Sequence, residues 1–75
     1  MFVVTNRKEK TMLPHQERVV EEKAALDEKI GKLFVFITGE KFKTTVSLEE
    51  QQRLKLQCNL MTAYSMVLGM RIDAF

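Results

Sequence analysis

The chain has 75 residues, of which 45% are hydrophobic and 29% are charged, and its formal net charge is +2. This size and balance are typical of one small soluble domain. No apolar run approaches the roughly 18 residues that a membrane span needs, and the short apolar start precedes its charges, unlike a signal peptide. A single cysteine, Cys58, excludes an internal disulfide framework, and with a single histidine we expect no metal and no cofactor.

The positive charge gathers near the N-terminus, where Arg7, Lys8 and Lys10 lie, and the remainder of the chain is close to neutral. A protein that binds DNA or RNA needs several uncompensated cations along a phosphate backbone, so this distribution argues against such a function. Residues 1–12 carry this excess charge and show no helical period, so we expect them to be a short N-terminal extension that assembly does not require. Residues 13–75 should form the domain.

The chain from residue 13 to residue 37 is predicted to form one helix. Pro14 suits a first helical turn, and Thr11 is a candidate N-cap. Apolar side chains recur at steps of seven, four, three and four, which places them on one helix face. They are Val19, Leu26, Ile30, Leu33 and Ile37. The opposite side carries two oppositely charged pairs typical of a solvated face, Arg18 with Glu22 and Glu28 with Lys32.

A break in the helical pattern follows. Gly39 is expected to end the first helix in a left-handed C-terminal cap. Residues 40–46 are predicted to be a loop, with Phe42 folded back onto the helices. Ser47 and Glu50 fit a capping box, in which the serine hydroxyl accepts from the Glu50 N–H and the glutamate reaches back.

A second helix is predicted from about Leu48 to Ile72, and it is apolar over a wide arc. One side holds Leu54, Met61, Tyr64, Leu68 and Ile72. Further apolar residues lie elsewhere around the helix, namely Leu56, Leu60, Met66, Val67 and Met70. One face can meet the first helix, and the rest needs another partner. Chains this small usually gain stability from disulfides, a metal or oligomerisation, so we expect an all-α antiparallel two-helix hairpin that assembles as a helical homo-oligomer.

The sequence shows no pattern for catalysis. The three glycines are scattered and form no phosphate loop, and a lone helical cysteine such as Cys58 is usually a small core residue. Adjacent acids such as Glu21 and Glu22 point about 100° apart on a helix and make no catalytic dyad. We therefore expect a binding or structural protein and not an enzyme.

Two stretches of the chain resemble a phage family. The first lies in the first helix and consists of Leu13-Pro-His-Gln-Glu-Arg-Val-Val-Glu-Glu-Lys23, followed by Leu26-Asp-Glu-Lys-Ile30 and by Lys32-Leu33. The second lies in the second helix and is Met61-Thr-Ala-Tyr-Ser-Met-Val-Leu-Gly-Met-Arg-Ile72. The resemblance is to the helical hairpin of the phage anti-CBASS sponges and of one class of anti-Thoeris sponges. It implies a homo-oligomer, a hexamer in the anti-CBASS branch, that works in the host cytoplasm. Such proteins sequester cyclic dinucleotides between two protomers without cleaving them, and a separate pocket takes cyclic trinucleotides.

The resemblance also implies site residues. An aromatic side chain near the start of the first helix stacks on a base, and this chain has His15 at that position. A lysine further along meets phosphate, for which Lys29 is the first candidate and Lys23 the alternative. Arg18, one turn after His15, is a candidate second cation.

For the trinucleotide pocket the resemblance nominates Thr62 and Arg71. A structural role explains Arg71 at least as well as ligand binding does, because the helix dipole favours a cation near a helix C-terminus.

Two other functions remain open at this point. One is a small helical interaction module, or an inhibitor, that binds a host protein through its apolar helix face. The other is a nucleic-acid binder that uses the cations of residues 1–12 as an arm. Neither of these functions predicts that a cyclic dinucleotide would stabilise the protein against heat.

Overall fold

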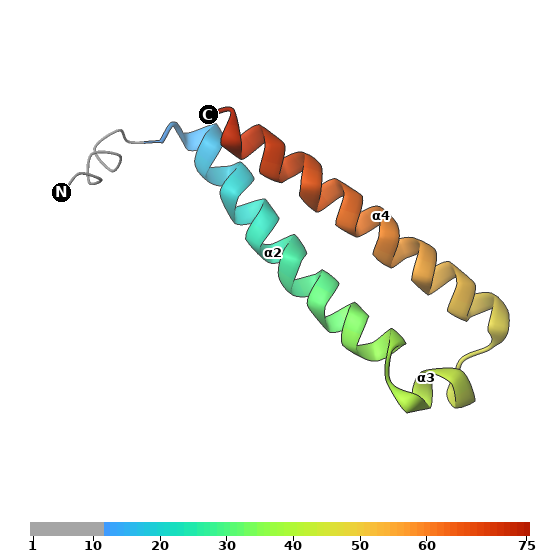
Figure 1. Cartoon of the computed structure of the whole chain (residues 1–75). Coiled ribbons are helices and arrows are strands. Elements are labelled where there is room, and N and C mark those ends of the chain that lie inside the picture. The colour runs from blue at the N-terminus through green and yellow to red at the C-terminus, as the bar shows by residue number, and fades with distance from the viewer. Residues whose placement is uncertain (1–11) are drawn as a thin grey trace.

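The computed structural model describes residues 12–75, and this part of the chain is an antiparallel helical hairpin (Figure 1). Helix α2 spans Pro14–Ile37 and helix α4 spans Leu48–Asp73, with the short helix α3, Glu40–Thr45, at the closed end. The all-α hairpin and the extents of both long helices confirm the predictions to within one residue. The extension, apart from Met12, lies outside the described residues, and so does Thr11, the proposed cap.

The two long helices meet along an inner seam with a regular three–four spacing in both. In α2 the seam residues are Gln16, Val19, Lys23, Leu26, Ile30, Leu33 and Ile37, and in α4 they are Gln51, Leu54, Cys58, Met61, Ser65, Leu68 and Ile72. All of them are buried or half-buried, as expected for a coiled-coil pairing. The predicted apolar face of the first helix is confirmed, and so is the burial of Cys58.

The prediction that Tyr64 shares this inner face is wrong. Tyr64 precedes the buried Ser65 by one residue, so it points about 100° away from the seam, and 46% of it is exposed. Ser65 and Cys58 occupy the seam positions instead. The apolar pattern alone favoured Tyr64 over Ser65 because a buried serine adds nothing to an apolar periodicity.

The end of α2 differs from the expected glycine cap. Thr38 is the C-cap residue, and its hydroxyl donates to the Phe34 carbonyl at 2.8 Å. Gly39 has φ −80° and ψ 160°, so it is extended and not left-handed. It is the N-cap residue of α3, because a new helix starts directly after it.

The segment 40–46 is mainly helical, so the prediction of a loop is wrong. Phe42 accounts for this: it is 1% exposed and packs edge-on against the Phe36 ring, with centroids 5.4 Å apart. The Gln51 amide also donates to the Val46 carbonyl at 2.8 Å and ties the connection to α4. Six residues are too few to show a helical period, so only these tertiary contacts reveal α3. The expected burial of Phe42 is confirmed.

Helix α4 begins with half of the predicted capping box. The Ser47 hydroxyl accepts from the Glu50 N–H at 3.2 Å. The Glu50 carboxylate does not return the contact and accepts from Arg53 Nε at 2.7 Å. Among the helices of residues 12–75, none has a stretch apolar and long enough to cross a bilayer.

Candidate ligand-binding face

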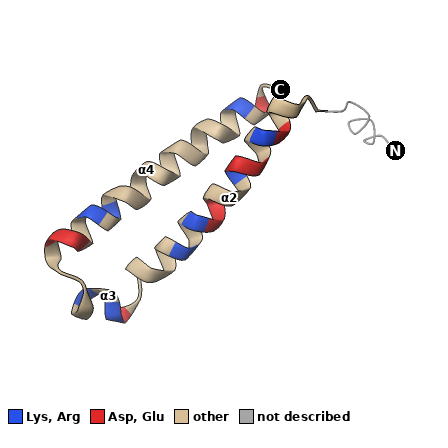
Figure 2. Ribbon diagram, turned by 180° about the vertical axis from the view of Figure 1, so that it is seen from behind, with Lys and Arg blue, Asp and Glu red and all other residues tan. Residues whose placement is uncertain are grey.

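Four of the six nominated residues lie on one face of the hairpin. On α2, His15, Arg18, Glu22 and Lys29 follow a three–four–seven spacing, so they form one stripe beside the inner seam. The side chains of His15, Arg18 and Lys29 are exposed. Figure 2 shows the alternating charges along α2, in contrast to the long uncharged part of α4.

Tyr64 joins this stripe to α4. Its hydroxyl donates a hydrogen bond to the Glu22 carboxylate across the hairpin. Arg71 lies seven residues after Tyr64, hence on nearly the same side of α4. We call this surface the Tyr64 face; its residues are His15, Arg18, Glu22, Lys29, Tyr64 and Arg71.

One ion pair predicted on this stripe is missing, and its carboxylate, that of Glu22, accepts from Tyr64 instead. In the described part of the chain, Arg18 forms no ion pair with Glu22, whereas Lys32 and Glu28 pair at 3.6 Å as predicted. Among the described residues the Arg18 side chain is therefore exposed without an ion-pair partner, one helical turn after His15.

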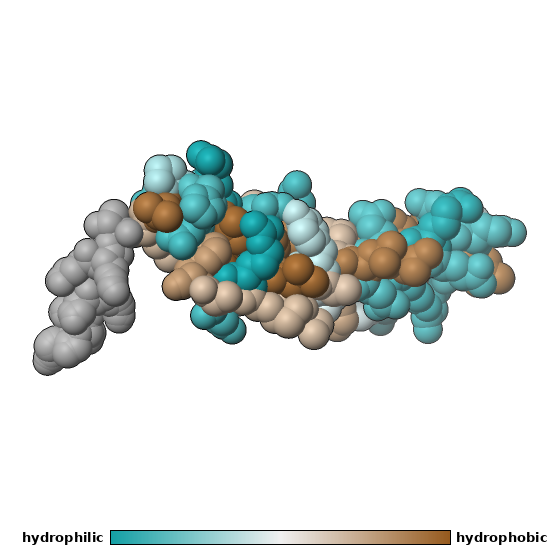
Figure 3. All heavy atoms as spheres, turned by 90° about the horizontal axis from the view of Figure 1, so that it is seen from above, coloured by the Kyte–Doolittle hydropathy of each residue, from teal (hydrophilic) through white to brown (hydrophobic). Residues whose placement is uncertain are grey.

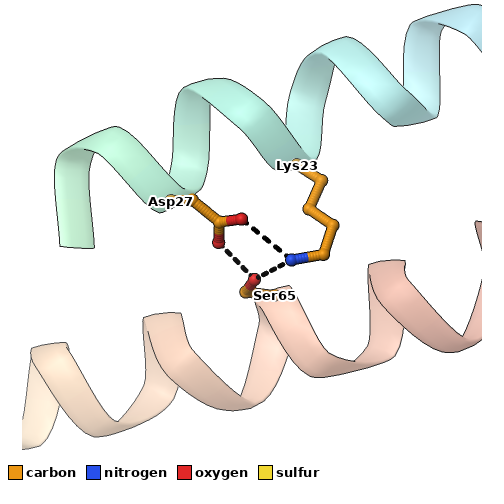
Figure 4. A network of polar contacts seen from close by, with 3 residues as sticks. All are labelled: Lys23, Asp27 and Ser65. Carbon is orange, nitrogen blue, oxygen red and sulfur yellow. Dashed lines mark hydrogen bonds and ion pairs between the residues drawn. The ribbon is translucent and has the colours of Figure 1, made fainter. Parts of the chain in front are cut away.

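Lys23, the alternative phosphate ligand, points into the inner seam. Its ammonium donates to Asp27 at 2.8 Å and to the Ser65 hydroxyl at 2.9 Å, and that hydroxyl donates to the second Asp27 oxygen (Figure 4). The Lys23 ammonium and the Ser65 hydroxyl, both bonded to its carboxylate, lower the pKa of Asp27 from its ordinary value of 3.8. With its ammonium engaged in this cluster, Lys23 is less suited to a phosphate than Lys29, for which the described residues show no ion pair.

Distance along the helix limits what one protomer can do alone. His15 and Lys29 are fourteen residues apart, which is about 21 Å at 1.5 Å per residue. One small ligand cannot touch both in the same chain, so a site that uses both needs two copies. Thr62 and Arg71 are nine residues apart, which turns them to opposite sides of α4. The structure therefore does not bring this pair together within a protomer.

Helix α4 carries a second apolar stripe on its outer side. Its residues again follow a three–four spacing: Leu56, Leu60, Ala63, Val67, Met70 and Ala74, which we call the outer stripe. All six are exposed, and Leu60 is 62% exposed. No charged residue occurs between Lys55 and Arg71. In Figure 3, brown and tan hydrophobic patches lie between hydrophilic side chains along the length of the molecule. The sequence pattern predicted that this side of α4 is apolar, but it did not predict the three–four arrangement.

Comparison with known proteins gives one match. The model of the family described as Sequestin matches residues 13–74, almost the whole of the described hairpin. The chain belongs to the Sequestin family. No curated protein and no solved structure matches it.

Membership of the Sequestin family gives the hairpin a general role. The family name denotes a protein that sequesters, so this sequestin chain has a binding role and not a catalytic one. Within residues 12–75, no group of three His, Cys, Asp or Glu side chains is placed to hold a metal ion. The chemistry that the Tyr64 face offers is stacking, hydrogen bonding and positive charge, all of which serve to hold a ligand.

Proposed function

We propose that this sequestin chain is a phage sponge that captures cyclic oligonucleotide immune signals in the host cytoplasm and holds them uncleaved. The family match over residues 13–74 is the observation that carries the proposal. The ligands are cyclic dinucleotides in the first place, and cyclic trinucleotides in a separate pocket. Capture of such a signal would keep it from the effector that it activates.

The Tyr64 face has chemistry that suits this ligand class. A ring that can stack on a base, His15, shares the stripe with two exposed cations, Arg18 and Lys29. Charge-assisted hydrogen bonds from such cations to phosphate are stronger than neutral ones. A cyclic dinucleotide has two bases and two phosphates, so two copies of one ring and one lysine would match it.

The separation of about 21 Å between His15 and Lys29 supports a site built from two copies. We propose that the chain is a homo-oligomer, a hexamer as in the anti-CBASS sponges, and that the outer stripe lies in its interfaces. A three–four apolar stripe without charges fits packing against a further helix. Met66 and Tyr64, which flank the outer stripe, would lie near those interfaces. Thr62 and Arg71 remain candidates for the trinucleotide pocket if they come from different copies.

Calorimetric titration with cyclic di-AMP, cyclic di-GMP and cyclic tri-AMP tests the proposal. At least one should bind, and Lys29→Ala should weaken binding of a dinucleotide by about tenfold or more. The reason is that each charged hydrogen bond contributes about 1.5–3 kcal/mol and 1.4 kcal/mol is one decade. Lys32→Ala, which removes a lysine already paired with Glu28, should leave the affinity within about twofold.

The same titration examines the stacking residue. His15→Ala should weaken binding by about 1–3 kcal/mol for each lost stack, and His15→Tyr should preserve or improve it. The ligand should be recovered intact after the complex is denatured. Equal affinities in Lys29→Ala and Lys32→Ala would reject Lys29 and direct the search to Lys23, and a linearised product would contradict sequestration.

The second candidate function is an interaction module that binds a host protein. The observation in its favour is the outer stripe, since an exposed amphipathic helix can lie in the groove of a partner. This function predicts that no cyclic nucleotide shifts the melting temperature. It also predicts a monomer in solution, with the outer stripe available to the partner.

A further inference from the structure

An open hollow lies at the closed end of the hairpin. It has a volume of about 920 Å³ and is lined by residues of all three helices and by the turn after α2. That volume falls at the upper end of the range of small-molecule sites, about 300–1,000 Å³. The hollow contains no residue of the Tyr64 face, and of the residues nominated from the resemblance only Thr62 lines it.

The hollow lies on the opposite side of the hairpin from the Tyr64 face. Thr62, Asn59 and Lys55 line it, and they follow a three–four spacing on the flank of α4 away from Tyr64. The hollow belongs to a single protomer, whereas the proposed dinucleotide site needs two. A ligand held here would therefore occupy a separate site.

The lining combines an apolar surface with two cations. Phe34 contributes an aromatic ring that is 56% exposed. Lys43 from α3 and Lys55 from α4 also line the hollow, and no ion pair among residues 12–75 involves either of them. Glu40 is the one acidic residue in the lining, so the two lysines give the lining a net positive charge.

The remaining polar groups favour an anion as well. The Thr62 hydroxyl donates to the Cys58 carbonyl at 2.9 Å, so its proton is already engaged within α4. The hydroxyls of Thr38 and Thr44 likewise donate to backbone carbonyls, so the side-chain donors left for a ligand are the two lysine ammonium groups and the Asn59 amide. Two ammonium groups beside an exposed ring complement a molecule in which a planar ring carries a phosphate.

We propose that this hollow is a second ligand site, which binds a small aromatic phosphate ester within one protomer. The ring of the ligand packs against Phe34, and its phosphate accepts hydrogen bonds from Lys43 and Lys55. The proposal rests on the lining of the hollow and does not depend on the capture of cyclic nucleotides at the Tyr64 face.

Phenyl phosphate is the simplest probe, and it is titrated into the full-length chain while backbone amide shifts are recorded. Shifts should concentrate at Phe34, Lys43, Asn59 and Thr62. Phenol and inorganic phosphate should each bind at least about tenfold more weakly, since each provides only half of the contacts.

Variants then test the two cations. Lys43→Ala with Lys55→Ala should lower the affinity for phenyl phosphate by at least about tenfold. Lys32→Ala with Lys41→Ala removes the same charge from exposed positions that do not line the hollow, and it should change the affinity by less than about twofold.

Three results would overturn the proposal: no shifts at millimolar probe, shifts located elsewhere, or equal losses in the two double variants. Binding of cyclic di-AMP should be retained in the Lys43→Ala, Lys55→Ala protein. Loss of that binding would show that the two sites are one, whereas its absence in the wild type would reject the sponge function and leave this site standing.

Discussion

Lys23 Nζ donates a hydrogen bond to Ser65 Oγ across the hairpin at 2.9 Å, and both residues occupy inner-seam positions that are otherwise mainly apolar. Polar groups at such positions cost stability but fix the pairing of helices, because only one register satisfies them. Asp27 completes the arrangement by contacting both. We therefore predict that the cluster specifies how α2 and α4 align.

Replacing the polar pair with apolar residues should separate stability from alignment. Lys23→Met with Ser65→Leu, together with Asp27→Ala so that no carboxylate is left without partners, should keep or raise the melting temperature. The amide spectrum should nevertheless show more than one peak for residues along the seam, as registers interchange. Ser65→Ala alone should lower the melting temperature with a single set of peaks. One sharp set of peaks in the triple variant would argue against a role in alignment.

Stability should depend on pH through Asp27. Its pKa is lowered in the folded protein, chiefly by the hydrogen bond from Lys23, so its stabilising contribution is present above the ordinary pKa of 3.8. That contribution is lost as the pH falls below this value and through the lowered folded-state pKa. The gap in melting temperature between the wild type and Asp27→Asn should therefore be constant from pH 7 to about pH 5 and close at lower pH.

Glu21→Gln is the matched control for that experiment, because Glu21 is an exposed carboxylate on the same helix. Its melting temperature should follow the wild type in parallel across the whole range. A gap between the wild type and Asp27→Asn that persists unchanged to pH 2 would show that the charge of Asp27 contributes nothing.

The closed end should depend on one aromatic side chain. Phe42→Ala should lower the free energy of unfolding by about 3 kcal/mol, because a nearly inaccessible ring is removed and α3 loses its anchor. Phe34→Ala, at a ring that is 56% exposed, should cost less than about 1 kcal/mol. Urea unfolding monitored by helical circular dichroism measures both, and equal losses would contradict the assigned packing.

The two apolar sides of α4 should respond differently to substitution. Leu68 is fully buried in the inner seam, so Leu68→Ala should lower the free energy of unfolding, measured in urea, by about 2–5 kcal/mol. Leu60→Asp on the outer stripe should leave each hairpin helical but lower the mass in light scattering toward the 8.7 kDa of a single chain. A wild-type protein that already has this mass would reject the oligomer.

The sequence by itself determined the helical hairpin, since apolar residues from Val19 to Ile37 repeat with a helical period and a break follows. The serine cap of α4 and the burial of Cys58 could also be predicted, because both depend on residue type and local spacing. The nominated site residues came from the resemblance, and their periodicity places His15, Arg18 and Lys29 on one stripe.

Only the tertiary structure decided which polar residues lie inside. Ser65 and Lys23 occupy the seam because each satisfies the other across the hairpin, and such pairing over forty-two residues leaves no local signal. The helix α3 likewise forms because Phe42 is buried against Phe36. A segment of six residues is too short for its sequence to predict that contact. Periodicity reports what a helix buries on average, whereas these elements depend on particular partners that only folding brings together.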